Sequence, residues 1–322
     1  LQGDTLAPYL FIIVIDYVLR RSDHALQELY ATAAPAPPLR RVTRSTTRAT
    51  LQQHAVTDLD YADDIALIDP DITIAQAHLL IVEREALAVG LRISCPKTKC
   101  VAVPAALLEH APPLHTQDGS TIATQEDFLY LGSYMNTTKD VQHRIAAAWT
   151  AAKKLFRLWK SQIPQAQKRK FFQCMIMPIL LYGCESWALD PTLLQKLHAN
   201  LTRLLRFALN VHWSTHTRNS ALYDYIPRMA DTLRYRRVKF AGHAIRADDQ
   251  PVSSLLLQPD PQRANPALTI QSLLVDDLAD KSITSLAHCK YRTEQMSKIK
   301  STAIDRAAWR SLVGRLPLRP PS

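Results

Sequence analysis

Leu59-Asp60-Tyr61-Ala62-Asp63-Asp64-Ile65-Ala66-Leu67 places two adjacent carboxylates between two short apolar runs. The runs on either side favour β-strands, so the stretch predicts a hairpin whose tip presents Asp63 and Asp64. A tight turn without glycine is unusual, and we expect its backbone geometry to be kept for function. An ordinary solvated turn is the alternative interpretation, because acidic pairs are frequent at turns.

The acidic pair also predicts a chemistry. Two neighbouring carboxylates repel each other unless a cation lies between them, and Mg²⁺ in phosphoryl-transfer sites is held by one or two carboxylates together with substrate phosphates. The hairpin therefore predicts a magnesium site formed by Asp63 and Asp64. Phosphoryl or nucleotidyl transfer is the leading reaction class.

Composition favours a partner that carries negative charge. The chain has 322 residues, a formal net charge of +10 and a pI of about 9.4, so a nucleic-acid backbone is the expected electrostatic partner. Its five cysteines are scattered and form no zinc pattern. Apolar runs are too short or too interrupted to predict a membrane span.

Hydrophobic periodicity predicts an α+β chain. Helices are expected over Leu6 to Leu29 and Ile74 to Val89, and again from Asp140 to about Leu209. Between the second and third of these regions lie four short β-prone runs, separated by Pro and Gly signals. The runs are Val101 to Val103, Leu114 to Thr116, Thr121 to Ala123 and Phe128 to Leu131.

The helical region that begins near Asp140 is basic on one side. Lys153, Arg157 and Lys160 recur at helical spacing and are candidates for contact with a nucleic-acid duplex; solvation of an ordinary helix surface is the alternative. Further on, the stretch 228–240 interleaves arginines with aromatic residues. That combination suits nucleic-acid binding, and equally suits the buried side of a helix.

Several motifs together resemble the reverse transcriptases of non-LTR (LINE-type) retrotransposons, and they follow the order of that family. Tyr61-Ala62-Asp63-Asp64 resembles the Tyr-x-Asp-Asp signature of the polymerase palm. The other similar segments are Gln2 to Phe11, Gly90 to Lys99, Phe128 to Gly132, Leu181 to Trp187, Gly242-His243 and Asp305 to Arg310. The resemblance runs almost from end to end and identifies the chain as a C-terminal fragment that starts at the Gln-Gly-Asp motif.

This resemblance implies RNA-templated DNA polymerisation, with RNA template, DNA primer and dNTPs as partners. Asp63 and Asp64 would bind two Mg²⁺ ions, for which Mn²⁺ is a possible substitute, and Lys97 would protonate the leaving pyrophosphate. Two exposed lysines on a turn, Lys97 and Lys99, are the alternative reading of that segment. The substrate-binding positions are then Gln2, Gly3, Tyr61, Phe128, Tyr130, Lys153, Arg157 and Lys160. For Phe128 and Tyr130, packing without substrate contact is the alternative role.

Three domains follow from the resemblance. Residues 1–135 would form a partial right-hand palm, an antiparallel sheet with helices. Residues 136–210 would form a helical thumb. Residues 211–322 would form a basic, mainly helical region with a linker near 258–266, in which His243 has no assigned role. By the same resemblance the protein is expected to be intracellular, in nucleus and cytoplasm, with no membrane partner.

The family's third metal-binding aspartate and its fingers lie upstream of the Gln-Gly-Asp motif, and both are expected to be missing from this fragment. An upstream palm and fingers portion of the same element is therefore an expected partner. Loss of a metal ligand costs several kcal/mol of transition-state stabilisation, so we expect no polymerisation by the chain alone. A catalytically inactive nucleic-acid-binding remnant is the alternative function.

Overall fold

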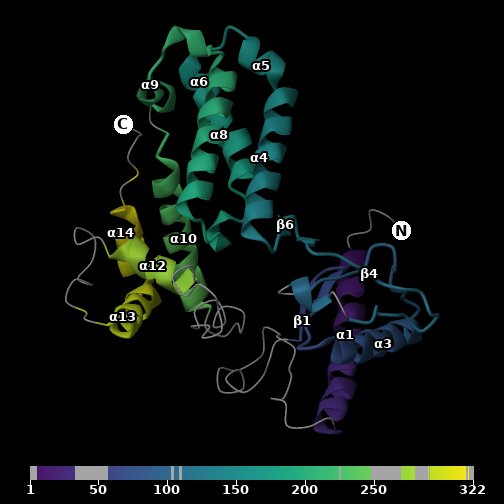
Figure 1. Cartoon of the computed structure of the whole chain (residues 1–322). Helices are drawn as coiled ribbons and strands as arrows, with labels where there is room; N and C mark the ends of the chain where they lie inside the picture. The colour runs from purple at the N-terminus through teal and green to yellow at the C-terminus, as the bar shows by residue number, and fades with distance from the viewer. Residues whose placement is uncertain are drawn as a thin grey trace. The chain divides into compact units, whose positions relative to one another are not determined.

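The computed structural model describes residues 6–32, 57–102, 105–108, 111–224, 226–247, 270–279, 289, 291–316 and 318 (Figure 1). The chain divides into two compact units, the first ending at Gly132 and the second beginning at Ser133. The predicted end of the palm, residue 135, lies between strand β6 (Ser133–Tyr134) and helix α4 (Thr137–Lys154).

Two long helices form the base of the N-terminal unit. Helix α1 (Ala7–Thr32) packs against α3 (Ile72–Ala88), as Figure 1 shows, and its inward side buries Val18, Leu19 and Leu26. The Asp71 side chain caps α3 by accepting hydrogen bonds from the backbone of its first turn. Both predicted helices are confirmed, because caps and apolar periodicity are local signals.

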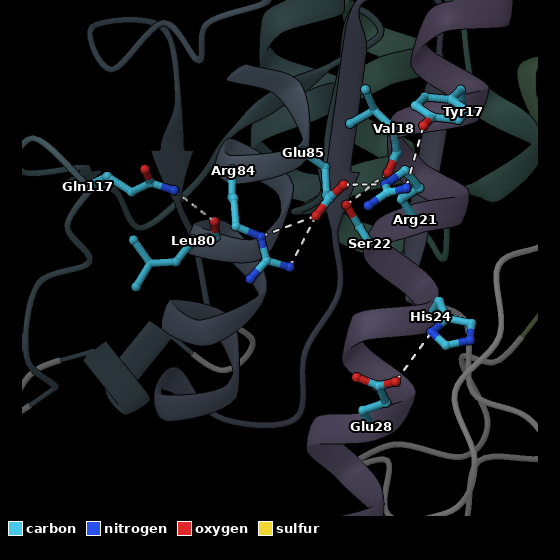
Figure 2. Close-up of polar contacts among 10 residues, drawn as sticks. All are labelled: Tyr17, Val18, Arg21, Ser22, His24, Glu28, Leu80, Arg84, Glu85 and Gln117. Atoms are coloured by element: carbon cyan, nitrogen blue, oxygen red, sulfur yellow. Dashed lines mark hydrogen bonds and ion pairs between the residues drawn. The ribbon is translucent and has the colours of Figure 1, made fainter. Parts of the chain in front are cut away.

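The facing sides of these helices also share a buried carboxylate. Glu85 of α3 accepts a hydrogen bond of 2.5 Å from Arg21 of α1 and is 3.1 Å from Arg84 (Figure 2). The Arg21 guanidinium lowers the pKa of the Glu85 carboxyl below its ordinary value. Arg21 also donates a hydrogen bond of 3.5 Å from Nη1 to the Tyr17 hydroxyl. This second contact fixes the orientation of the Arg21–Glu85 ion pair.

The strands are short and pair in twos. Strand β1 (Asp58–Tyr61) pairs antiparallel with β2 (Asp64–Leu67), whereas β3 (Lys99–Cys100) pairs parallel with β4 (Ala123–Thr124). Strand β5 (Leu129–Tyr130) ends the unit, and a 3-10 helix, η1 (Ala105–Leu108), precedes the β4 region. No sheet in the described ranges has more than two strands, so the predicted single antiparallel palm sheet is not observed. The class is α+β and mostly helical.

Local chemistry explains why the later strands do not extend. Pro112 and Pro113 have no amide hydrogen to donate to a ladder. Directly after them, residues 115 and 121 form only an isolated bridge. This segment instead docks on α3, where Gln76 exchanges two hydrogen bonds of 2.7 Å with the His115 backbone. Gln117 also donates a hydrogen bond to the Leu80 carbonyl (Figure 2).

The C-terminal unit is helical. Its helices begin with α4, α5 (Phe156–Lys160), α6 (Gln165–Phe171), a π-helical segment η2 (Phe172–Ile176), α7 (Met177–Leu180), η3 (Cys184–Ser186), α8 (Pro191–Leu209), η4 (Trp213–Thr215), α9 (Asn219–Tyr223) and α10 (Met229–Arg246). All of these except α6 and η4 contribute residues to a first hydrophobic core. Leu197 and Leu201 of α8 share this core with Tyr223 and Met229. The predicted thumb boundary between residues 210 and 211 therefore falls inside one hydrophobic core.

The helix predicted to run on from Asp140 is broken at Leu155, between α4 and α5. The indole of Trp159 donates a hydrogen bond of 2.8 Å to the Ala152 carbonyl. A continuous α-helix would use that carbonyl for the amide of Phe156. The break thus comes from a buried side chain that competes with the backbone.

A second core joins α10 to α12 (Ile270–Leu278), α13 (Arg292–Ile304) and α14 (Arg306–Gly314). At the crossing of α10 and α14, a Cβ on Gly242 would overlap the Trp309 indole. Asp305 caps α14 and so fixes the approach of Trp309. Two motifs far apart in the sequence thus form one packing contact, while His243 is exposed. The predicted linker 258–266 lies outside the described residues.

One buried carboxylate organises the start of the C-terminal unit. Asp140, only 2% exposed, accepts hydrogen bonds from the Trp187 indole (2.7 Å) and the Tyr134 amide (3.0 Å). Arg144 lies 3.8 Å from the same carboxylate and stacks on the Tyr182 ring, 4.3 Å from its centroid. The segment from Leu181 to Trp187 is therefore tied to α4 through a single acid.

Among the described helices, none has the length and apolarity to cross a bilayer.

Replacing Gly242 with alanine is expected to destabilise the C-terminal unit by about 3 kcal/mol, because the new methyl group displaces Trp309 from its core. Urea unfolding followed by tryptophan fluorescence measures this, since all five tryptophans lie in that unit. Gly314→Ala is the matched control: nothing lies within 4 Å of its added Cβ, and a change of no more than about 1 kcal/mol is expected. Equal stability of the Gly242→Ala protein and the wild type would contradict the packing account.

Asp140→Asn is expected to lower the free energy of unfolding by about 3 kcal/mol. The amide group of asparagine turns one of the two acceptor oxygens into a donor, which then faces either the Trp187 N–H or the Tyr134 N–H. The same fluorescence-detected urea titration reports it. An exposed acid changed in the same way, Asp63→Asn, should shift the midpoint little; a small shift for both variants would show that the Asp140 contacts do not stabilise the unit.

Candidate functional site

The acidic motif forms the predicted hairpin. Tyr61 pairs with Asp64, which leaves Ala62 and Asp63 as a two-residue turn, and an amide–carbonyl bond of 2.7 Å between Ile68 and Thr57 closes the base. Ala62 has φ of +57°, in the left-handed region that favours glycine. The turn holds backbone strain of order 1 kcal/mol at this position.

Four of the seven residues from 58 to 64 are aspartates. Asp58 is buried, whereas Asp60, Asp63 and Asp64 are exposed. Strand alternation and the pairing register place Asp64 on the face of Tyr61, opposite the face shared by Asp58 and Asp60. The tip therefore presents two adjacent carboxylates to solvent from a rigid turn.

These two carboxylates are open to an added ligand. Within the described residues, the side chains of Asp63 and Asp64 take part in no ion pair and no hydrogen bond. The same part of the chain holds no group of three or more His, Cys, Asp or Glu side chains arranged for a metal ion. The donor set suits Mg²⁺ bound through one or two carboxylates whose other ligands come from elsewhere.

Tyr130 is attached to the hairpin across a long sequence separation. Its hydroxyl lies 3.1 Å from the Leu59 carbonyl, to which it donates, and 3.5 Å from the Asp64 carbonyl. Burial raises the pKa of the Tyr130 phenol, and the negative charges of Asp64, Asp60 and Asp58 raise it further. Tyr130 thus holds the two strands of the motif from one side, a contact that sequence reasoning did not predict.

A second support comes from a buried pair that the sequence did not predict. His78 of α3 lies with Nδ1 3.0 Å from Asp69, which follows β2, and both side chains are almost completely buried. The pair ties the end of β2 to α3. The only sequence signal was an acid and a histidine on either side of a helix start, which is too common to identify a contact.

The remaining predicted positions are dispersed. Lys97 is exposed in the turn after α3, where its amide donates to the Ser94 carbonyl, and no described hydrogen bond or ion pair joins it to the hairpin. Phe128 and Tyr130 are half-buried while Leu129 and Leu131 are exposed, so the expected alternation is present. Gln2 and Gly3 lie outside the described residues.

The basic positions belong to the C-terminal unit. Lys153, Arg157 and Lys160 are exposed, but the break at Leu155 places the first on α4 and the others on α5. Farther on, the interleaved stretch 228–240 is largely used inside the protein: Arg236 donates to the Leu181 carbonyl at 2.6 Å, and Arg237 pairs with Asp277 at 3.0 Å. For these two arginines the buried-helix interpretation holds.

Comparison with known proteins gives one distant relationship. The chain is 24% identical over 217 residues to an uncharacterized transposon-derived protein of Caenorhabditis elegans, an alignment that covers 63% of this chain and 76% of that protein. No protein-family model matches the chain. No solved structure matches it either. The chain therefore shares its ancestry with a protein of transposon origin.

The contact between Tyr130 and the hairpin predicts a titration. The Tyr130 phenol should ionise above the ordinary tyrosine pKa of about 10. Asp64→Asn should move that pKa down, because it removes one of the charges that raise it. Since the folded-state pKa is raised, the stability gained from neutral Tyr130 is present below pH 10 and is lost as the pH rises through the folded value.

Nuclear magnetic resonance of ¹³C-labelled tyrosine, assigned with Tyr130→Phe, follows this ionisation directly. Asp118→Asn removes one exposed charge elsewhere in the same unit and should leave the Tyr130 titration unchanged. A Tyr130 pKa at the ordinary value, or an equal response to both variants, would mean that the phenol does not lie against the acidic hairpin.

Proposed function

We propose that this chain carries part of the polymerase site of a non-LTR retrotransposon reverse transcriptase, and that it acts in RNA-templated DNA synthesis. The observation that carries the proposal is the Tyr61-Ala62-Asp63-Asp64 hairpin, which presents two unengaged carboxylates from a strained, glycine-free turn. The relationship to a transposon-derived protein supports the same origin.

In this proposal Asp63 and Asp64 hold Mg²⁺. When bound, a divalent ion supplies charge stabilisation to phosphoryl oxygens and lowers the pKa of an attacking hydroxyl. The chain's own part is to keep both carboxylates adjacent and fixed. The left-handed Ala62 and the two-residue turn set their spacing, and Tyr130 and the Asp69–His78 pair fix the strands behind them.

The template, primer and incoming nucleotide are the substrates that the resemblance to non-LTR reverse transcriptases implies. Tyr61, 67% exposed and on the face of Asp64, is available to a substrate beside the carboxylates. The exposed ammonium of Lys97 is a candidate proton donor to the leaving pyrophosphate. For this role, a bound substrate would have to reach both Lys97 and the hairpin carboxylates. Phe128 and Tyr130 stay proposed primer contacts, although the Tyr130 hydroxyl already bonds to the hairpin.

Two carboxylates are a sparse ligand set for two metal ions. The described residues bring no third acidic, histidine or cysteine ligand to the hairpin, so polymerisation requires ligands from substrate phosphates and from another polypeptide segment. This feature also favours a second candidate function, nucleic-acid binding without catalysis. The two candidates differ in whether the hairpin binds a divalent cation.

Binding of Mn²⁺, followed by the electron paramagnetic resonance signal of the free ion, tests the metal site. The wild-type chain should bind Mn²⁺ with an affinity that falls about tenfold or more in Asp64→Asn, because one of two ligand carboxylates is lost. Asp118→Asn, which removes one exposed carboxylate away from the hairpin, should bind like the wild type. Equal binding by all three proteins would overturn the proposal in favour of the non-catalytic function.

Primer extension on an RNA template tests the ligand argument. The chain alone should add labelled dNTP no faster than the Asp63→Ala/Asp64→Ala variant, since two carboxylates do not complete a two-metal site. Extension clearly above that variant would show that these two acids suffice with substrate phosphates.

A further inference from the structure

Charge is distributed very unevenly along the C-terminal unit. Residues 141–223 contain twelve Lys or Arg residues and two acidic residues, Glu185 and Asp190, so their net formal charge of +10 equals that of the whole chain. No acidic residue occurs between Val141 and Cys184. The positive charge of the protein is therefore concentrated in the part that forms α4 to α9.

Some of this charge is used internally. Lys168 donates to the Trp159 carbonyl at 2.6 Å, Arg169 to Leu222 at 3.0 Å, and Arg206 to Thr217 at 2.7 Å. Others, including Lys153, Arg157 and Lys160, are exposed. A surplus that the segment's own acids cannot neutralise favours a polyanionic partner.

The same part of the unit exposes aromatic rings. Trp213 of η4 is 73% exposed, whereas Trp159, Trp187 and Trp309 are buried and Trp149 is partly buried. Phe156 of α5 is 48% exposed. The His212 ring lies 5.4 Å from that of Trp213. Transfer of a large aromatic ring out of water is favourable. Exposed rings beside positively charged side chains therefore indicate a binding surface.

Contacts place Lys160 and Phe156 at the C-terminal end of α8, and the chain position of Trp213 places it there as well. The Lys160 ammonium lies 2.6 Å from the Asn210 side chain, which caps α8, and 5.7 Å from the centre of the Phe156 ring. Trp213 follows Asn210 by three residues. Helices α5 and α9 lie at this same end of the bundle (Figure 1).

The two acidic residues of the segment lie at the other end of α8. Asp190 caps the N-terminus of that 19-residue helix, roughly 28 Å from its C-terminus, and Glu185 precedes it and pairs with Arg236. Both are therefore remote from Phe156, Arg157, Lys160, His212 and Trp213, and Asp224, which follows α9, lies 3.9 Å from Arg169. We call Phe156, Arg157, Lys160, His212 and Trp213 the aromatic–basic end.

We propose that the aromatic–basic end binds single-stranded nucleic acid, with unpaired bases stacked on Trp213 and Phe156 and phosphates beside Arg157 and Lys160. Exposed rings stack on base faces that neighbouring bases leave uncovered, as in a flexible single strand, while cations track the backbone. A duplex offers the cations its phosphates but offers the rings no base face. The inference rests on the proposed function in one respect, that the ligand is a nucleic acid. It does not involve the hairpin carboxylates.

The position of Trp213 gives a direct assay. It is the most exposed of the five tryptophans, so stacking should quench the red-emitting part of the fluorescence when a 15-nucleotide oligo-U or oligo-dT is added. Affinity is measured independently, by anisotropy of the labelled oligonucleotide. Trp213→Ala should weaken binding about 5- to 100-fold, in line with the loss of one stacked base.

Matched variants separate stacking from general effects. Trp213→Phe keeps a ring and should bind within a few-fold of the wild type, whereas Tyr291→Ala removes an exposed ring at the start of α13 and should change nothing. Affinity should fall steeply with salt, and a duplex of the same length should bind more weakly and without quenching.

Three results would overturn the proposal: equal affinity of wild type and Trp213→Ala, equal quenching by single strand and duplex, or self-association through Trp213 that is insensitive to salt. Its failure is distinguishable from failure of the proposed function. Oligonucleotide binding by Trp213 with no carboxylate-dependent Mn²⁺ binding would refute the polymerase site alone, and the reverse outcome would refute the aromatic–basic end alone.

Discussion

The buried carboxylate of Asp140 is the contact on which the C-terminal unit depends. It joins three segments in one hydrogen-bonded group: the Tyr134 amide just after the unit begins, Arg144 one turn along α4, and the Trp187 indole beyond α7. A charge so deeply buried is tolerated only when its oxygens are satisfied. The segment between Leu181 and Trp187 supplies one of the hydrogen-bond donors to this carboxylate, so its aromatic residues have a structural role there.

In the N-terminal unit the hairpin is small, and neighbouring residues hold it in place. Two four-residue strands are marginal alone in water. Tyr130 bonds to the backbone of the hairpin, and the Asp69–His78 pair anchors its exit to α3, so the strained turn at Ala62 persists. The carboxylates of Asp63 and Asp64 are thereby fixed without being engaged in internal contacts. A fixed, unsatisfied acidic pair is the property that a cation site requires.

Local features of the N-terminal unit could be predicted from the sequence. The hairpin and the helices over residues 7–32 and 72–88 follow from apolar periodicity, turn composition and capping by Asp71. Contacts between distant residues could not. The break at Leu155 depends on the Trp159 indole reaching Ala152. The predicted antiparallel palm sheet is not observed among the described residues, where part of the chain expected to form it docks on α3.

The same limit applies to the candidate site. Tyr61, Asp63 and Asp64 were identifiable because the motif is contiguous, whereas the Tyr130 contact spans 71 residues and the His78 contact depends on the fold. The sequence left two interpretations of the stretch 228–240 open, because the partners of Arg236 and Arg237 lie in segments far along the chain. Gly242 and Trp309 show the converse, since two unexplained motifs became one packing contact.

The proposed binding of a divalent cation at the tip of the acidic hairpin can be tested directly. Fe²⁺ in place of Mg²⁺, with ascorbate and peroxide, generates hydroxyl radicals that cut the backbone next to the bound ion, and mass spectrometry locates the cuts. If the hairpin binds the ion, cuts should be confined to about residues 57–68 in the wild type and should be lost in Asp64→Asn. Cuts elsewhere, or the same cuts in the variant, would contradict it.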